Sequence, residues 1–540
     1  MPRINSNSSS LIRRARAEWV ARVIFWAGLS APLWAVVWAY CPLSGAEWRQ
    51  SLSILDRIAL HRLANSVALG FLTAIFSTLL AIPVFGVYLF LPGWGRKLLV
   101  PAGLLPLSLP PFGVTSAWMT FLSQWNSNEG RILWSAESAS SRFLYSLPGT
   151  ACILSFCFWP IAFLFLTLSS RLTRSQVESA FLYLNPWSRF RRVFFPAWKE
   201  PLAIAATMIF CLGLTQFEVP SLLQVNVYPL EIFIRFSALL REQEALMLCL
   251  PYALFLSVLA WWVNRGANTL AWSEQDEFVI RFTPWIRRIS GAAAVGVFAV
   301  SIVVPLVEQV RRSGSPAFIW NIGMEQAGPI FHSIAYCGTG ALGAVILGLL
   351  FTAGREINGG LFSSAFFLFL FILPGGLLAS GWLWLRSSWP GVLPDFIAIL
   401  TLISAYISHV FILGYLAGKL LWKQYGFAQR EMDSLLPLTV KDKFLHLYLP
   451  TFWLPVSQAA ALISLFLWGE IAITTLLYPP GAETLAVQYF NLLHYGSEKR
   501  TAAVGLFLLW IPTLILLLTF LPGLVRARMS RRESSVSGTA

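Results

Sequence analysis

Long apolar runs alternate with short polar segments along this chain of 540 residues. A helix needs about 20 mostly apolar residues to cross the hydrocarbon core of a bilayer, and only helices or closed barrels satisfy their backbone there. The runs are long and continuous, which favours helices over strands. They predict an all-α polytopic membrane protein with about twelve membrane-spanning helices, at residues 19–40, 62–90, 98–122, 147–169, 201–223, 245–264, 288–307, 329–353, 361–385, 395–421, 454–478 and 501–522.

One long polar interruption occurs twice, as SQVESAFLYLNPWSRFRRVFFPAWKEP over residues 175–201 and as REMDSLLPLTVKDKFLHLYLPTFWLP over 430–455. The prolines that close the two copies, Pro196 and Pro450, are 254 residues apart. Shorter patterns recur at similar separations: Asn65-Ser66 with His332-Ser333, Leu109-Pro110 with Leu373-Pro374, and 230–236 with 484–490. These recurrences predict two repeats of six helices, and because six is even both repeats have the same orientation in the membrane.

The repeats divide the chain into five parts. We expect a disordered cytoplasmic N-terminus at 1–18, a first half at 19–264, a linker at 265–287, a second half at 288–523 and a cytoplasmic tail at 524–540. With the N-terminus inside, most of the 39 Lys and Arg residues fall in cytoplasmic segments, which is the bias expected of an inner-membrane protein. Both termini and both polar interruptions are then cytoplasmic.

Composition supports this class. Hydrophobic residues make up 57% of the chain and charged residues 12%, against about 25% charged in typical soluble domains. The net charge of +14 is spread over short loops and forms no array, so nucleic acid is not an expected partner. The six cysteines show no CxxC spacing and are interpreted as packing residues, while the five histidines form no metal-ligand spacing. His409 is predicted to be a satisfied interior histidine.

Each polar interruption predicts a pair of short cytoplasmic helices. In the first copy Ser175-x-x-Glu178 is a capping box for a helix that begins at Gln176, and Asn185 caps a second helix that runs from Pro186 to about residue 195. In the second copy Thr439-x-x-Asp442 has the same starting role. Aromatic side chains on such helices fit a docking surface for a partner, whereas an amphipathic helix lying on the membrane surface is the alternative.

Two carboxylates and several prolines stand out within the apolar runs. Glu218 and Glu470 occupy matching places in the fifth and eleventh predicted helices, in the outer half of the bilayer. They mark either a pathway or gate for a solute, or helix ends near the outer surface. Pro110 and Pro374 predict a bent or broken helix in each half, which either shapes a translocation path or is accommodated by neighbouring helices.

No catalytic chemistry is expected. The phosphate-binding pattern G-x-x-x-x-G-K-[ST] does not occur, and no cluster of acids, histidines and a nucleophile indicates an enzyme. The glycines at 338, 340 and 343 match a dinucleotide fingerprint, but they lie in an apolar run with no strand before it and are interpreted as helix-packing positions. We therefore expect no cofactor and no metal site.

The interruptions resemble the EAA loops of binding-protein-dependent ABC importer permeases, whose pattern is E-A-A, a Gly three residues on and an aliphatic-x-Leu-Pro ending. Glu431 stands at the family's distance from Pro450, and Glu178 stands one residue closer to Pro196. The family's glycine is absent from both copies. The fused arrangement, with YPPGAETL at 478–485 and LLHYG at 492–496, is similar to the ferric-iron branch, and the thiamine branch is close behind.

The resemblance implies a permease subunit in a bacterial inner membrane that has no ATPase activity of its own. Two copies of a cytoplasmic ABC ATPase would bind its two loops, and an extracytoplasmic solute-binding protein would deliver the solute. It implies ferric iron as the solute, with thiamine, a polyamine or an oxyanion as alternatives; a secondary transporter of twelve helices is a further alternative. The residues expected to couple to the ATPases are Glu178, Pro186, Trp187, Phe190, Arg191, Pro196, Glu431, Asp442, Phe444 and Pro450.

Overall fold

The computed structural model is helical throughout the part of the chain that it describes, which comprises residues 28–31, 33–34, 37, 57–128, 139–168, 174–239, 241–267, 283–352, 361–387, 394–425 and 440–537. Within these ranges nine helices are long and apolar enough to cross a membrane, and two further pairs of helices together pass the same test but are sharply bent. These eleven correspond to eleven of the predicted spans. The remaining one, at 19–40, lies largely outside the described residues, so the total of twelve stays a prediction.

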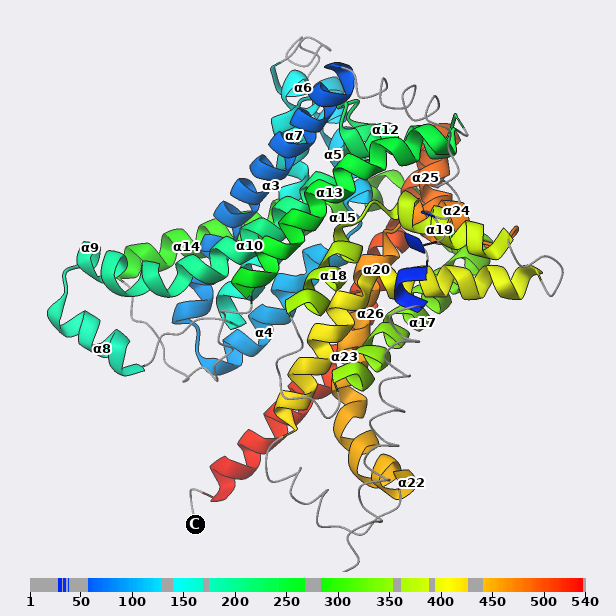
Figure 1. Ribbon diagram of the computed structural model, residues 1–540. Coiled ribbons are helices and arrows are strands. Elements are labelled where there is room, and N and C mark those ends of the chain that lie inside the picture. Colours follow the sequence, from blue (N-terminus) through cyan, green and yellow to red (C-terminus); the bar gives the residue numbers. More distant parts are fainter. Residues whose placement is uncertain are drawn as a thin grey trace, which may run out of the picture.

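The first half contains thirteen described helical elements. Helices α3, α7 and α10 pack against one another, and α12 crosses the end of α3 at the top of Figure 1. Their bounds are α3 Arg57–Phe90, α4 Gly93–Leu104, η1 Leu105–Ser108, α5 Pro111–Asn128, α6 Ala139–Leu144, α7 Leu147–Leu168, α8 Arg174–Tyr183, α9 Pro186–Arg189, η2 Phe190–Phe194, α10 Phe195–Thr215, α11 Glu218–Leu222, α12 Tyr228–Ser237 and α13 Glu242–Ala267.

The second half follows a similar plan, with α17, α20 and α23 as its packed core. Its last helix, α26, continues to Ser537, beyond the predicted end of the span at 522. The bounds are α14 Pro284–Phe298, η3 Ala299–Val303, α15 Val304–Arg312, α16 Pro316–Glu325, α17 Ala327–Thr352, α18 Leu361–Ile372, α19 Gly375–Ser387, α20 Pro394–Gln424, α22 Val440–Lys443, η4 Phe444–Tyr448, α23 Leu449–Trp468, α24 Ala472–Leu477, α25 Leu485–Tyr495 and α26 Glu498–Ser537.

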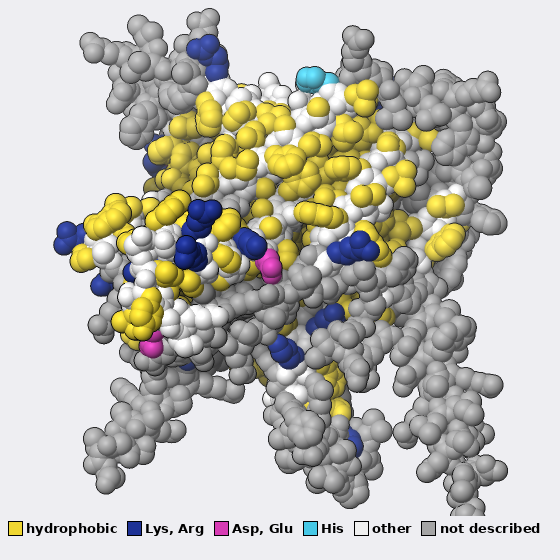
Figure 2. Space-filling view, turned by 60° about the vertical axis from the view of Figure 1, so that its left-hand side comes forward, with side chains coloured by type: hydrophobic (Ala, Val, Ile, Leu, Met, Phe, Trp, Pro, Cys, Tyr) yellow, Lys and Arg dark blue, Asp and Glu magenta, His cyan; other side chains and the backbone are white. Residues whose placement is uncertain are grey.

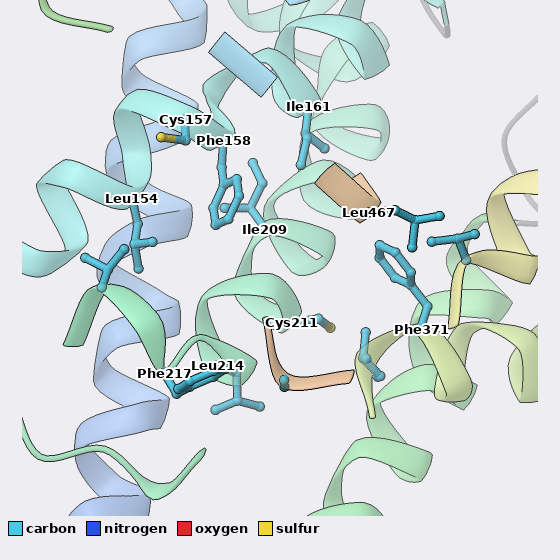
Figure 3. Close-up of a cluster of buried hydrophobic side chains, with 14 of the residues drawn as sticks. Leu154, Cys157, Phe158, Ile161, Ile209, Cys211, Leu214, Phe217, Phe371 and Leu467 are labelled. Carbon is cyan, nitrogen blue, oxygen red and sulfur yellow. The ribbon is translucent and has the colours of Figure 1, made fainter. Parts of the chain in front are cut away.

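The halves interlock. Helix α13 of the first half packs against α18 of the second, while α26 of the second half packs against α4, η1 and α5 of the first. The buried apolar cluster therefore runs across both halves. Figure 3 shows part of it, with Phe158 of α7 and Ile209 of α10 on one side and Phe371 of α18 and Leu467 of α23 on the other. Neither half encloses its core alone.

Outward-facing side chains of the spans are apolar. Phe71, Ile75, Leu79 and Ile82 follow one face of α3 at helical spacing and are each more than half exposed. Figure 2 shows hydrophobic side chains covering one broad face of the molecule, with Lys and Arg gathered mainly along its lower part and left edge. In water such a surface would be unfavourable, so it is the surface expected for contact with lipid.

Both predicted bends are present. The third span is bent by 80° between Ser108 and Pro111, and the ninth by 99° between Ile372 and Gly375. Pro110 and Pro374 lie in these breaks, where their missing N–H removes a helical hydrogen bond. The carbonyl of each proline then accepts a bond from the next helix, from Gly113 N–H at 2.9 Å and from Leu377 N–H at 3.0 Å. The prediction of bent or broken helices is confirmed.

A second matched feature joins α3 to α12 and α17 to α25. The buried hydroxyl of Ser66 on α3 accepts from the backbone N–H of Tyr228 at the start of α12, at 2.8 Å. The buried hydroxyl of Ser333 on α17 accepts in the same way from Leu485 at the start of α25, at 2.7 Å. The preceding residues, Asn65 and His332, also contact matching carbonyls, those of Asn226 and Glu483. Both halves therefore anchor a short helix, α12 or α25, by the same contact.

Close packing explains the glycine pattern in α17. A Cβ atom added to Gly340 would lie 3.0 Å from Tyr406, and one added to Gly343 would lie 2.7 Å from Ile407, both on α20. The backbones approach even more closely further along, where a Cβ on Gly414 would lie 2.1 Å from the Ala344 carbonyl oxygen. These contacts agree with the interpretation of Gly340 and Gly343 as packing positions. For Gly338 the interpretation is wrong, because nothing lies within 4 Å of a Cβ atom added there.

Candidate functional site

A cavity of about 140 Å³ lies where the two halves meet. It is lined by residues from both helix breaks and from the ends of α10 and α23. All four residues predicted for a path or gate, Pro110, Pro374, Glu218 and Glu470, line it together. The rest of the lining is mainly apolar and aromatic: Leu107, Leu109, Pro111, Cys157, Phe158, Leu212, Thr215, Gln216, Phe217, Pro229, Phe233, Phe371, Leu373, Gly375, Gly376, His409, Leu465, Phe466, Gly469 and Ala472.

Glu218 is placed by the end of α10. The helix stops at Thr215, Gln216 adopts an extended conformation, and Glu218 is the first residue of the short helix α11. Its side chain is buried, and the backbone N–H of Ile471, from the other half, donates to its carboxylate. Phe217 beside it stacks on Phe233 with ring centroids 4.3 Å apart.

Glu470 is placed by the end of α23. That helix stops at Trp468, Gly469 is its C-cap, and Glu470 precedes α24. The Glu470 Oε1 atom accepts from the backbone N–H of Ile473 at 3.1 Å, and Oε2 lies 3.9 Å from His409 Nε2. A side chain at position 375 would crowd this carboxylate, because a Cβ atom on Gly375 would lie 2.8 Å from Oε1.

The prediction that both glutamates lie within spanning helices is wrong. Both spans end early, at Thr215 and Trp468 instead of residues 223 and 478, and each carboxylate lies just beyond the break. The reason is local: the N–H groups at the start of α24 have no partners within that helix, and the carboxylate of Glu470 binds one of them. Because α10 and α23 end before Glu218 and Glu470, both carboxylates lie at the interface between the halves.

His409 is the cavity residue whose role the sequence did not predict. It is an interior histidine of α20, as expected, but it faces the cavity and Glu470, and its Nδ1 atom has no hydrogen-bond partner among the described residues. No spacing could have revealed this, because Glu470 lies 61 residues away in the sequence.

A metal centre is not evident. Within the described ranges no group of three or more His, Cys, Asp and Glu side chains could hold a metal ion. The described cysteines, Cys152, Cys157, Cys211, Cys249 and Cys337, are free thiols, and all except Cys152 are buried, as expected for packing residues. Cys41 lies outside the described residues.

The first polar interruption forms an elbow, which we define as α8, α9 and η2, residues 174–194. The Asn185 side chain accepts from Ser188 N–H at 2.8 Å, which confirms the predicted cap. Arg189 stabilises the turn between α8 and α9. Its guanidinium carbon lies 3.8 Å from the centre of the Phe181 ring, and its Nη2 atom donates to the Leu184 carbonyl at 3.0 Å. The elbow projects from the left of Figure 1, and α22 and the C-terminal end of α26 project at the bottom.

The surface of the elbow is apolar and basic. Tyr183 is 83% exposed, Leu182 is 77% exposed and Trp187 is 70% exposed. The predicted coupling residues Glu178, Pro186, Phe190, Arg191 and Pro196 are exposed as well. A groove lined by α8 and the start of α10, with a volume of about 660 Å³, runs beside them.

Two details of the elbow differ from prediction. Helix α8 already includes Arg174, so it does not begin at Gln176. The second helix does not end near residue 195, since α9, η2 and α10 form one continuous helix from Pro186 to Thr215. The segment η2 is a turn of π-helix, in which the N–H of Phe195 bonds to the Phe190 carbonyl. This wider turn precedes Pro196, which has no N–H to contribute, so the helix continues through the proline.

The second interruption is described only from Val440 onward, and Glu431 lies outside the described residues. The start predicted at Thr439 also lies outside the described residues, while Asp442 lies in the described part of α22, Val440–Lys443. Phe444 opens a second turn of π-helix, η4, and Pro450 follows in α23. The two π-turns, Phe190–Phe194 and Phe444–Tyr448, are 254 residues apart, as are the two prolines.

Comparison of this chain with family models, curated proteins and solved structures finds no match. The fold and the cavity define a class, an all-helical polytopic membrane protein with a mixed carboxylate and aromatic cavity at its centre.

Proposed function

We propose that this chain is the membrane-spanning permease subunit of an ATP-driven, binding-protein-dependent importer, located in a bacterial inner membrane with both termini in the cytoplasm. The observation that supports this best is the pairing of features around one cavity. Each half contributes a proline break and a glutamate to it, and each half contains the same π-turn before a span that leads to that glutamate. A duplicated chain around a shared path is the arrangement expected of such a permease.

The continuous helix gives this proposal a mechanism. From Pro186 to Thr215 there are 30 residues, which at about 1.5 Å per residue make a rod of about 45 Å. One end of the rod carries the exposed elbow, and the other end leads through Gln216 to Glu218. A partner that moves the elbow would therefore move the carboxylate, and α22, η4 and α23 would do the same for Glu470.

The partner would be two copies of a cytoplasmic ABC ATPase, one on the elbow at 174–194 and one on its counterpart in the second interruption, which we call the second elbow and whose described part is α22 and η4. Exposed aromatic and basic side chains, such as Trp187 and Arg191, suit a protein interface because aromatic residues and Arg are enriched there. Closure of the two ATPases would draw the elbows together and switch the halves between inward-facing and outward-facing states. An extracytoplasmic protein would deliver the solute, for which the resemblance favours ferric iron, with thiamine, a polyamine or an oxyanion as alternatives.

Coexpression and copurification with a candidate ABC ATPase from the same source test the proposal. The double variant Arg191→Glu, Lys443→Glu reverses the charge on both elbows, and it should lower the yield of ATPase per chain while leaving the thermal unfolding of the chain unchanged. Arg288→Glu is the control, because Arg288 is an exposed base on α14, outside both elbows. Wild-type chain should retain two ATPase copies. Concentrative uptake by the chain alone, without nucleotide, would favour the secondary transporter instead.

A further inference from the structure

We propose that the cavity between Glu218 and Glu470 is a binding site for an organic ammonium cation, which would be the solute in transit in place of the ferric ion that the resemblance favours. The identity of this cation as transported solute rests on the proposed function, whereas its binding to the cavity does not.

The cavity lacks a positive charge. Glu218 is only 6% exposed and Glu470 joins it from the other half, yet no Lys or Arg is among the lining residues. Within the described ranges neither carboxylate has a Lys or Arg partner, and the one basic neighbour is His409, 3.9 Å from Glu470. Buried carboxylates are costly unless a cation or several hydrogen bonds compensate them. A bound cation would supply the missing charge.

The remaining lining favours an organic cation over a metal ion. Five phenylalanines, Phe158, Phe217, Phe233, Phe371 and Phe466, line the same cavity. Aromatic faces attract substituted ammonium groups. A ferric ion would instead require several oxygen or nitrogen ligands, and the described residues contain no group of three or more side chains that could supply them.

The volume limits the size of the cation. The cavity of about 140 Å³ is close to an engineered cavity of about 150 Å³ that binds benzene. A small quaternary ammonium, or the ammonium end of a longer molecule, fits such a space. The two carboxylates from opposite halves would then bind a single charge between them.

A matched pair of probes tests the inference. Choline and 3,3-dimethylbutan-1-ol have the same shape, but choline has a charged nitrogen where the alcohol has a neutral carbon. Equilibrium binding of each is measured to the purified full chain in lipid nanodiscs, without ATPase. Choline should bind with one site per chain, and the neutral alcohol should bind at least about tenfold more weakly, because the carboxylates attract only the cation.

Variants assign the binding to the cavity. Glu218→Gln and Glu470→Gln should each weaken choline binding about tenfold or more, whereas Glu325→Gln, the same change at an exposed acid on α16, should leave it unchanged. Phe217→Leu keeps both carboxylates and should still weaken choline binding several-fold, because it removes an aromatic face. Thermal unfolding of each variant shows whether it is folded.

Several results would overturn the inference. These are absence of choline binding to wild type, equal binding of choline and the alcohol, or choline binding that survives both glutamate variants. Ferric citrate that competes with choline for wild type would assign the cavity to a metal ion and would also overturn it. Loss of ATPase copurification would refute the importer proposal alone, since no ATPase takes part in these binding measurements.

Discussion

The two halves line the cavity with matching helix breaks and with different side chains. In the first half Glu218 is buried and opens α11, and α7 contributes Cys157 and Phe158 to the lining. In the second half Glu470 is partly exposed and lies close to Gly375, and α20 contributes His409. The breaks, the π-turns and the serine contacts are common to both. We infer that the features common to both halves fix the positions of the helices around the cavity. The side chains that differ between the halves make the cavity asymmetric.

The largest loss of stability is expected from a substitution at the contact between α17 and α20, in the second half. Gly414→Ala would place a Cβ atom 2.1 Å from the backbone oxygen of Ala344, and backbone cannot move aside easily. We expect a loss of about 3 kcal/mol or more in the free energy of unfolding, seen as a lower yield of folded chain and a lower Tm. Gly70→Ala in the first half should cost less, because the added atom would lie 2.8 Å from the Phe210 ring and from its backbone oxygen, a less severe overlap than 2.1 Å.

Gly338→Ala is the control for both substitutions, since it lies on α17 with nothing within 4 Å of the added atom. It should be neutral or stabilising by about 0.5–1 kcal/mol, because alanine is favoured over glycine inside a helix. Equal Tm values for the Gly338 and Gly414 variants would show that α17 and α20 do not pack backbone to backbone.

Smaller losses of stability, equal in the two halves, are expected at the matched serine contacts. Ser66→Ala and Ser333→Ala each leave a buried backbone N–H, of Tyr228 or Leu485, without its acceptor. Each should cost about 1–3 kcal/mol of unfolding free energy, measured by thermal unfolding in the same detergent. Ser77→Ala should cost little, because the buried Ser77 hydroxyl has no hydrogen-bond partner within the described structure. Unequal effects at Ser66 and Ser333 would contradict the matched anchoring of α12 and α25.

The smallest change in stability is expected from a substitution of Trp198. Its Nε1 atom is buried without a hydrogen-bond partner in the described part of the chain, and the residue at the matching position of the second half is Phe452. Trp198→Phe should therefore change the Tm very little, since the lost ring area is offset by removal of an unsatisfied donor. A large loss of stability would show that the indole N–H has a partner, or that the halves pack differently here.

Much of the fold could be predicted from the sequence. Apolar runs of sufficient length defined eleven of the spans in the described structure, and Pro110 and Pro374 predicted the two bends, because proline cannot complete a helical hydrogen bond. The cap at Asn185 followed from its position before Pro186. These features depend on local chemistry, which the sequence carries directly.

The site could be predicted only in part. Glu218 and Glu470 stood out as acids in apolar runs, but their meeting in one cavity depends on how the halves pack. The early ends of α10 and α23 were missed because neither Gln216 nor Gly469 breaks an apolar pattern clearly. His409 was missed for a similar reason, since its contact with Glu470 is tertiary. The continuous helix through Pro196 required the π-turn, which has no sequence signature.

Labelling of the elbow tests the central claim most directly. Tyr183→Cys, in a chain whose six natural cysteines are replaced by alanine, puts a thiol at a position that is 83% exposed. A membrane-impermeant maleimide should label it in inverted vesicles and not in intact spheroplasts, and coexpressed ATPase should reduce that labelling. Labelling from the outside of spheroplasts, or labelling that the ATPase does not change, would contradict the account.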